Sequence, residues 1–278
     1  MPRSDTTTDL HRIARELRAR VIRMSHDGRA PHLGSSLSCI DILVAAYWRC
    51  LQIDPTAPLA PDRDRFILSK GHAAAALYAT LAKRNFFDAR ELDTYNVAGS
   101  RFPEQPSPRA VPGVEAATGS LGHGLSIGLG MALASRIQDR PYRVVAVLSD
   151  GECNEGTVWE AAMFAAAQRL DNVTVIVDFN RWQATDRSEQ VMAISPLVDK
   201  WQAFGWSAAE ADGHDIEALA DRMNEAPHEA GKPTAIIART VKGKGVSFME
   251  DDNNWHYRIP DDEELQAALE ELGVAADA

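Results

Sequence analysis

The sequence has few cysteines, no excess of positive charge and no long apolar runs. Its 278 residues include three cysteines that lie far apart, Cys39, Cys50 and Cys153. Disulfide frameworks and zinc sites need closer and more regular spacing, so buried thiols in a reducing cytosol are expected. Acidic residues outnumber basic ones by 40 to 29, which gives a net charge of −11. This balance argues against nucleic-acid binding, because phosphate recognition needs clustered Lys and Arg.

Membrane and export segments are missing as well. No apolar run approaches the length of a membrane span, and the longest nearly uncharged stretch, residues 110–133, is rich in glycine and contains Pro112. The first residues, MPRSDTTTD, lack the apolar centre of a signal peptide. We therefore expect a cytoplasmic protein that binds no membrane. The apolar content of 45% is ordinary for a globular protein.

Hydrophobic periodicity predicts a helical first part. Apolar residues three and four positions apart indicate a helix over 10–24, and further helices are expected at about 37–51 and from the Ala-rich run up to Leu81. A short buried strand is predicted at 65–69. Residues 96–120 contain four prolines and three glycines, which indicates a long loop before a helix at 122–137.

From residue 142 onward, predicted strands and helices alternate. Apolar, β-branched runs indicate strands buried on both faces at 143–148, 173–179 and 234–239, with one more strand near Trp206. The intervening helices are expected at 155–170, 196–204, 215–224 and 261–272. This alternation predicts an α/β fold with a doubly wound, mostly parallel sheet and helices on both faces. No linker or repeat divides the chain, so a single domain over 1–278 is expected.

Two polar residues follow neighbouring strands of the predicted sheet. Asp150 comes just after strand 143–148, and Asn180 just after strand 173–179. Ligands of open α/β sheets bind beyond the carboxyl ends of the strands, so both side chains are expected in one crevice. These oxygens, with a backbone carbonyl, suit Mg²⁺ or Ca²⁺, which would take its remaining ligands from a diphosphate and water. Gly151 lets the backbone approach that diphosphate closely. The alternative is that Asp150-Gly151 is only a turn and Asn180 only a strand-end cap.

The residues around this crevice resemble the thiamine-diphosphate motif of transketolases. That motif begins with Gly-Asp-Gly and ends with Asn; here it runs from Ser149-Asp150-Gly151 to Asp178-Phe179-Asn180. Other segments resemble the family in the same order: SKGH at 69–72, GVEAATGSLG at 113–122, WSAAEADGHD at 206–215, TVKGKGVS at 240–247 and Trp255-His256. The resemblance is collinear over nearly the whole chain, which makes it specific.

The resemblance implies a cofactor site for thiamine diphosphate and Mg²⁺ (or Ca²⁺). The metal would be bound by Asp150, Asn180 and the backbone carbonyl of Trp182. The cofactor itself would be contacted by a larger set of residues: His72, Gly119, Ser120, Leu121, Gly151, Glu152, Asn180 and His256.

The resemblance also implies catalytic roles. His32, His72 and His256 would line the substrate channel, where imidazole can donate, accept and shuttle protons near neutral pH. Glu155 and Glu160 match acidic residues that the family places at a subunit interface, linked toward the cofactor. The histidines at positions 11, 26, 214 and 228 are expected to be ordinary surface or core residues.

The family's full-length members have three domains, and this chain resembles only the first, the diphosphate-binding domain. In the family, the second domain supplies the glutamate that activates the cofactor and most contacts to the acceptor phosphate. The resemblance therefore implies the N-terminal subunit of a split transketolase, which transfers a two-carbon ketol unit from a ketose (phosphate) to an aldose. A partner chain with the pyrimidine-binding and C-terminal domains is expected, in an α₂β₂ assembly. Alone, this chain should be inactive, because half of the site is absent.

Three positions depart from the family pattern. Phe102, in Arg101-Phe102-Pro103-Glu104, stands where the family has the His of Gly-His-Pro-Glu, and phenylalanine cannot donate to a sugar hydroxyl. Substrate recognition is then expected to differ, with Arg101 able to meet an anion, unless the loop has rearranged without consequence. Ser149 replaces the first glycine of the metal motif. Residues 183–186 lack a family glycine, which puts the geometry of that loop in question.

Four other functions compete with this interpretation. The chain could belong to a deoxyxylulose-phosphate-synthase-like or keto-acid-dehydrogenase-type enzyme, or to a specialised sugar or natural-product pathway. The GVEAATGSLG and TVKGKG segments favour transketolase. A nucleotide-binding protein is the third alternative, because Gly122-His123-Gly124 opens a helix. It is weak, since the full dinucleotide-binding pattern is absent. A non-catalytic subunit would not need to retain Asp150, Asn180 and the three channel histidines.

Overall fold

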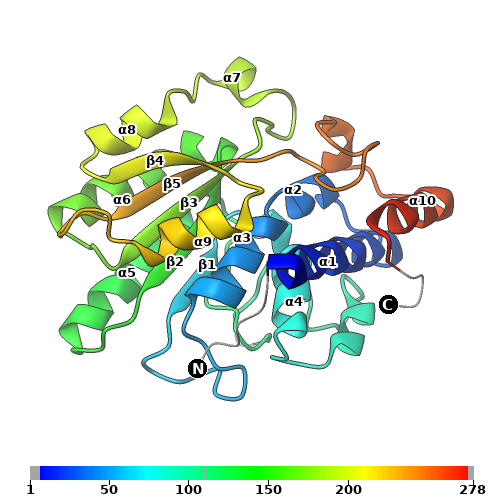
Figure 1. Cartoon of the computed structure of the whole chain (residues 1–278), viewed down its shortest axis with the longest axis horizontal. Coiled ribbons are helices and arrows are strands. Elements are labelled where there is room, and N and C mark those ends of the chain that lie inside the picture. Colours follow the sequence, from blue (N-terminus) through cyan, green and yellow to red (C-terminus); the bar gives the residue numbers. More distant parts are fainter. Residues whose placement is uncertain (1–6, 109, 275–278) are drawn as a thin grey trace.

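The centre of the molecule is a five-stranded parallel sheet (Figure 1). The computed structural model describes residues 7–108 and 110–274. The strand order is β1-β2-β3-β5-β4, and every neighbouring pair is parallel. The strands are β1 (Arg65–Leu68), β2 (Val144–Ser149), β3 (Val173–Phe179), β4 (Ser207–Asp212) and β5 (Thr234–Arg239). The predicted α/β class with a parallel sheet is therefore confirmed.

The central strands are buried on both faces, as their continuous apolar sequences predict. Every residue of β2 and β3 is buried. Alternate side chains enter two separate apolar clusters: Val144 and Ala146 face one, whereas Val145 and Val147 face the other. This alternation follows from the two-residue period of a strand. Helices must therefore cover both sides of the sheet.

One face is covered by helices from the two ends of the chain. These are α1 (Thr7–Asp27), α2 (Leu33–Ser38), α3 (Ile40–Ala45), α4 (Ala74–Lys83), α9 (Ile216–Asn224) and α10 (Asp262–Leu272). Figure 1 shows α10, in red, beside α1, in blue, and the two helices pack together. The other face is covered by α5 (His123–Ile137), α6 (Gly156–Ala167) and α8 (Leu197–Ala203). Within the described residues, none of the helices could span a membrane.

Several short helices lie in the connections. They are η1 (Ala46–Cys50), η2 (Gly71–Ala73), η3 (Ala89–Thr94), η4 (Gly151–Asn154), α7 (Ser188–Val191) and η5 (Asn253–His256). Of these, η2 and η4 follow directly on β1 and β2, and η5 ends at His256. The carboxyl edge of the sheet is therefore built from tight helical turns.

The helix predicted at 37–51 is interrupted. It divides at Cys39 into α2 and α3, and its last turn is the π-helical η1. A hydrogen bond lies just before the division. The Ser38 hydroxyl donates to Asp178 of β3 at 2.6 Å and thereby ties the end of α2 to the sheet. Apolar periodicity does not register such a contact.

Candidate functional site

The two residues predicted for a cation site meet at the carboxyl edge of the sheet. Asp150 follows β2 and is fully buried, and Asn180 follows β3 and is 2% exposed. The Asp150 carboxylate accepts hydrogen bonds from the Arg181 backbone N–H at 2.9 Å and the Ser188 hydroxyl at 2.8 Å. The Asn180 amide oxygen accepts from the Trp182 backbone N–H at 3.0 Å. The structure therefore brings Asp150, Asn180 and Trp182 together.

The charge on Asp150 is poorly compensated by the protein. Burial raises the pKa of this carboxyl to about 6, and the nearby Asp178 adds to the increase, against the effect of the Ser188 hydrogen bond. A buried carboxylate whose own protein supplies too little positive charge is suited to a bound cation. Among the described residues, no group of three or more His, Cys, Asp or Glu side chains is arranged to hold a metal. A cation at Asp150 would therefore need amide, carbonyl or ligand oxygens as well.

The loop after Asn180 closes without the family glycine. Trp182 pairs with Arg187 in an antiparallel bridge, and the Arg187 guanidinium lies 3.7 Å from the centre of the Trp182 ring. Asp251 accepts hydrogen bonds from both side chains. Gln183 N–H donates to the Asp186 carbonyl at 2.9 Å. These contacts hold the loop geometry that the missing glycine had put in question.

Three imidazole rings form a cluster next to this edge. The centroids of His32 and His72 are 5.4 Å apart, those of His32 and His256 are 4.9 Å apart, and those of His72 and His256 are 5.9 Å apart. The three residues are separated in the sequence and reach the cluster from the start of α2, from η2 and from η5. Tyr257, 61% exposed, stacks edge-on against His256. The resemblance predicted that these three histidines share one channel, and the structure places them together.

The imidazole cluster is largely uncharged at neutral pH. Burial lowers the pKa of His256 to about 3, assisted by the nearby Lys242 ammonium. Burial also places the pKa of His72 well below its usual range, and Lys70 and the other two imidazoles add to this effect. Neutral imidazoles can accept as well as donate hydrogen bonds, as proton transfer to a ligand requires.

Two buried lysines belong to the site, although the sequence interpretation assigned them no role. The Lys70 ammonium is fully buried and pairs with Asp178 of β3, which outweighs the effect of burial and raises the lysine pKa. Lys242 is also fully buried; it donates to Asn253 at 2.7 Å and lies 3.1 Å from His256 Nδ1. Burial and the neighbouring Lys70 lower the pKa of Lys242 to about 7. Both lysines lie inside motifs that carried the resemblance, SKGH and TVKGKG, and this was the available signal.

The loop before α5 lies against β1. Gly119 and Ser120 are exposed and Leu121 is half-buried, whereas the preceding Thr118 is buried and donates to the Leu68 carbonyl at 2.6 Å. A side chain at Gly71 would collide with the Thr118 carbonyl, so this position requires glycine. The exposed part of the loop is free to meet a ligand.

The Glu152 side chain anchors the loop before α5 by hydrogen bonds. Its buried carboxylate accepts hydrogen bonds from the Gly122 N–H at 2.8 Å, the Ser149 N–H at 3.2 Å and the Ser69 hydroxyl. Both oxygens are therefore engaged by the protein. The Glu152 side chain therefore positions the loop, and the cofactor contact that the resemblance implied for this residue stays a prediction.

Glu152→Ala is expected to destabilise the protein by about 1–3 kcal/mol, because it leaves buried N–H donors without an acceptor. Urea unfolding followed by circular dichroism measures this. Glu160→Gln, on the exposed outer side of α6, is the matched control and should change the free energy of unfolding by less than about 0.5 kcal/mol. Equal effects of the two substitutions would show that the Glu152 contacts contribute nothing specific.

The two glutamates expected at a subunit interface lie on the surface. Glu155 is the N-cap residue of α6, and Glu160 lies further along the same helix; both are exposed. Within the described part of the chain, no hydrogen bond or ion pair engages either side chain or joins it to the imidazole cluster. Their exposure leaves them accessible to another subunit.

Phe102 does not face the imidazole cluster. Its side chain is 1% exposed and packs against Tyr78 and Phe87, with ring centroids 5.4 and 5.0 Å apart. Arg101 pairs with Glu91 at 2.7 Å and lies over the Phe87 and Phe102 rings, so it does not face a ligand. The expectation that these two residues alter substrate recognition is therefore wrong, because they anchor the loop in the core.

The next two polar residues of this loop do reach the site. Glu104 Oε1 lies 2.7 Å from His32 Nδ1. The exposed side chain of Gln105 lies so close to Gly119 that a side chain at that glycine would collide with the Gln105 amide oxygen. A loop without hydrophobic periodicity gives no signal of which residue faces inward, and this is why Phe102 was misassigned.

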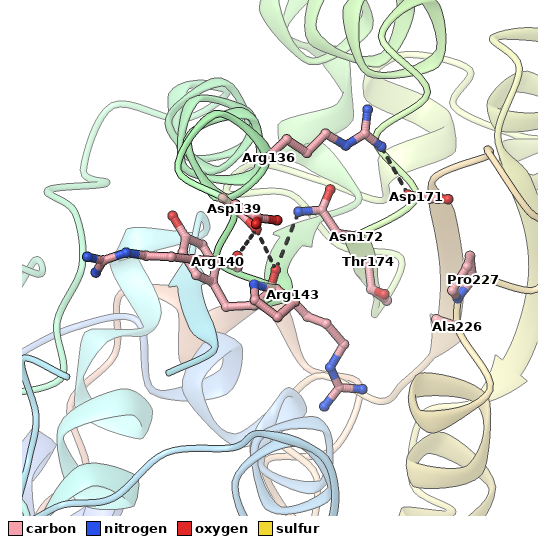
Figure 2. A pocket seen from close by; sticks show the side chains of 12 residues that line it. Arg136, Asp139, Arg140, Arg143, Asp171, Asn172, Thr174, Ala226 and Pro227 are labelled. Atoms are coloured by element: carbon pink, nitrogen blue, oxygen red, sulfur yellow. Dashed lines mark hydrogen bonds and ion pairs between the residues drawn. The ribbon is translucent and has the colours of Figure 1, made fainter. Parts of the chain in front are cut away.

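A separate cavity lies at the opposite edge of the sheet (Figure 2). Its volume is about 430 Å³, and residues that precede β2 and β3, such as Arg143 and Asn172, line it. Two of its arginines are paired with carboxylates of the protein: Arg136 with Asp171, which also lines the cavity, at 3.0 Å, and Arg143 with Asp64 at 3.1 Å. None of the predicted site residues lines this cavity, and Asp150 and Asn180 lie at the carboxyl edge instead.

Comparisons with known proteins agree with this geometry. Residues 10–278 match the family described as "Transketolase, thiamine diphosphate binding domain". The chain is 38% identical over 255 residues to a protein of Phocaeicola vulgatus that is named as one subunit of apulose-4-phosphate transketolase; the match covers 92% of this chain and 90% of that protein. It is 41% identical over 241 residues to 6-deoxy-6-sulfo-D-fructose transketolase subunit SqwG of Clostridium sp., which covers 87% of this chain and 88% of that protein.

Solved structures show the same relationship. Transketolase from Campylobacter jejuni superimposes with a TM-score of 0.90 and 26% identity, covering 99% of this chain and 44% of that one. The chain thus spans less than half the length of that solved transketolase, while it spans most of the length of the relatives named as subunits. This chain belongs to the transketolase family and corresponds to its thiamine diphosphate binding domain.

Proposed function

We propose that this chain is the N-terminal subunit of a two-chain transketolase that uses thiamine diphosphate and Mg²⁺. The observation that carries the proposal is the position of the buried, poorly compensated Asp150 carboxylate beside Asn180 and the three neutral imidazoles. A hard divalent cation fits this oxygen set, and Ca²⁺ would fit the same ligands. The family match supports the cofactor.

The residues present suggest how the cofactor would be held. Mg²⁺ would be bound by Asp150, Asn180 and the Trp182 carbonyl. The diphosphate would lie against Gly151, His72 and His256, and the rings against the exposed loop at 119–121. When bound, thiamine diphosphate supplies the carbanion-stabilising chemistry of ketol transfer. Lys242 and the imidazoles would orient substrate hydroxyls and hold or accept protons.

A second subunit would complete the site. The exposed loop at 119–120 and the exposed Glu155 and Glu160 give this chain an accessible surface beside the cofactor position. We propose a partner with the pyrimidine-binding and C-terminal domains, an α₂β₂ assembly and a cytoplasmic location, which the three buried free cysteines also suit.

The substrates we propose are a ketose donor and an aldose acceptor, at least one of them anionic. The two relatives with subunit names are named for a sugar phosphate and a sulfo-sugar, which supports a sugar phosphate or sulfonate of a specialised pathway. Neither Glu104 nor Gln105 supplies a cation for the anionic end of the sugar.

The test compares the purified chain with the complex that it forms with its partner subunit. The chain alone is expected to transfer no ketol unit, because it lacks half of the catalytic groups, and the complex is expected to be active. A coupled assay of ketol transfer and calorimetry with thiamine diphosphate and Mg²⁺ measure the two properties. Strong turnover by the isolated chain would refute the split architecture, and a complex that binds no thiamine diphosphate would refute the function.

A further inference from the structure

The long loop delivers one carboxylate to the imidazole cluster. Its course is set by Phe102, whose ring is buried in the core and whose carbonyl accepts from the Asn96 N–H at 2.9 Å. Two residues later, Glu104 reaches His32 and places its Oε1 2.7 Å from Nδ1. The His32 side chain is only 15% exposed and that of Glu104 32%. This pair is therefore better shielded from water than an ordinary surface ion pair.

The backbone of His32 is held independently of its ring. Its φ of 68° lies in the left-handed region, which non-glycine residues rarely adopt. Its N–H donates to the His256 carbonyl at 2.7 Å, and its own carbonyl accepts from the Ser36 N–H at 3.0 Å. Because the backbone is fixed, the remaining freedom is the rotation and the protonation of the ring. Glu104 acts on both.

The groups that face the His32 ring have opposing effects on its charge. The rings of His72, His256 and Tyr257 lie with centroids 5.4, 4.9 and 6.0 Å away, and Lys242 lies close enough to act on it. Burial, and to a lesser extent Lys242, lowers the pKa of His32, whereas Glu104 opposes this change. Within the described residues, Glu104 is the one carboxylate in contact with this ring. A carboxylate can only accept, so a neutral ring places its proton on Nδ1.

We propose that Glu104 is a positioning residue for His32: it keeps the proton on Nδ1 and leaves Nε2 as the acceptor that faces a substrate hydroxyl. This inference rests on the proposed function. The hydroxyl proton passes from its oxygen to Nε2 and returns from there in the reverse step, while the Nδ1 proton stays on the side of the ring that faces the Glu104 carboxylate, 2.7 Å away. Partners that orient a functional histidine in this way are known from metal sites and from catalytic triads.

The experiment compares two substitutions in the complex with the partner subunit. Glu104→Gln keeps the shape but removes the charge, and Glu104→Ala removes both. ¹⁵N NMR of labelled histidine is expected to show a proton on Nδ1 of His32 in the unmodified complex and a mixture of tautomers in Glu104→Ala. For ketose donors, kcat/KM of Glu104→Ala should fall about 10- to 100-fold, as for other residues that orient a functional ligand.

The pH profile separates this role from a structural one. His32 must be neutral to accept a proton, so activity falls as the pH drops through its pKa. The Glu104 charge raises that pKa, so Glu104→Gln should move the acid limb of kcat/KM to lower pH. Glu91→Gln, which breaks the nearby pair with Arg101, is the matched control and should leave the acid limb unchanged.

An unchanged His32 tautomer in Glu104→Ala, or an acid limb that does not move in Glu104→Gln, would overturn the inference. Thiamine diphosphate binding by calorimetry should be the same in all variants. If the unmodified complex transferred no ketol unit, the proposed function would fall, and the NMR measurement would still decide whether Glu104 sets the tautomer of His32.

Discussion

Asp150→Ala is expected to weaken the binding of thiamine diphosphate with Mg²⁺ by at least about 100-fold, since even residues that only support a metal ligand contribute 10- to 100-fold. The substitution removes the buried carboxylate that directly follows β2, beside Asn180 at the end of β3. It also removes the acceptor of the Arg181 and Ser188 hydrogen bonds that shape the following loop. Calorimetry on the complex with the partner subunit measures the affinity, and ketol transfer should be lost with it.

Asp186→Ala provides the matched control for Asp150. Asp186 is an exposed carboxylate in the same loop, where it accepts from the Arg187 N–H at 2.7 Å. Its removal should leave the cofactor affinity within a few-fold of the unmodified complex, because an exposed charge contributes little. Full cofactor affinity in Asp150→Ala would refute the metal assignment.

Asp178→Asn is expected to lower the free energy of unfolding by about 3–5 kcal/mol, the usual loss when one partner of a buried ion pair is removed. Asp178 and Lys70 are both fully buried. The Asp178 carboxylate also accepts from the hydroxyls of Ser38 and Thr240, so it joins α2, β1, β3 and the end of β5. Asparagine keeps the shape but leaves the Lys70 ammonium without its counter-charge. Denaturant unfolding measures the loss.

Two comparisons test the explanation of that loss. Glu210→Gln removes an exposed partner of Arg239 on the neighbouring strands and should cost less than about 1 kcal/mol. Replacing the pair together, in Lys70→Met/Asp178→Leu, should recover part of the stability, because no unpaired charge then remains in the core. If the double variant were less stable than Asp178→Asn, the hydroxyl contacts rather than the charge would be the main contribution.

The sheet and the proximity of Asp150 and Asn180 could be predicted from the sequence because both depend on local signals. The mostly apolar, β-branched segments at 144–149 and 173–179 form strands buried on both faces, and a polar residue immediately after each segment lies at the same edge of the sheet. The parallel register pairs Ser149 with Asp178, which brings the following residues together. Neither inference needed a contact between distant parts of the chain.

The lysines were missed because their partners are distant in the sequence. Lys70 and Asp178 are 108 residues apart, and a lone lysine after a strand is typical of a surface position. Lys242 contacts His256 across 14 residues of irregular chain. Likewise, the loop at 96–120 has no period from which to tell inward from outward residues, so the sequence suggested Phe102 where the structure has Glu104. Whether a charged side chain such as Lys70 is buried can be determined only when the fold is known.

The loop at 96–120 is carried by a different part of the fold from Asp150 and Asn180, so sugar preference and cofactor binding would depend on different segments. Asp150 and Asn180, which we propose to hold the cofactor, follow the fully buried strands β2 and β3, whereas Glu104 and Gln105 belong to a segment that is anchored by the Phe102 side chain. Under the proposed function, substitutions in the loop would alter the choice of sugar while Asp150 and Asn180 keep their places. Grafting this segment between relatives, with an aromatic anchor retained, should transfer sugar preference without disturbing cofactor binding.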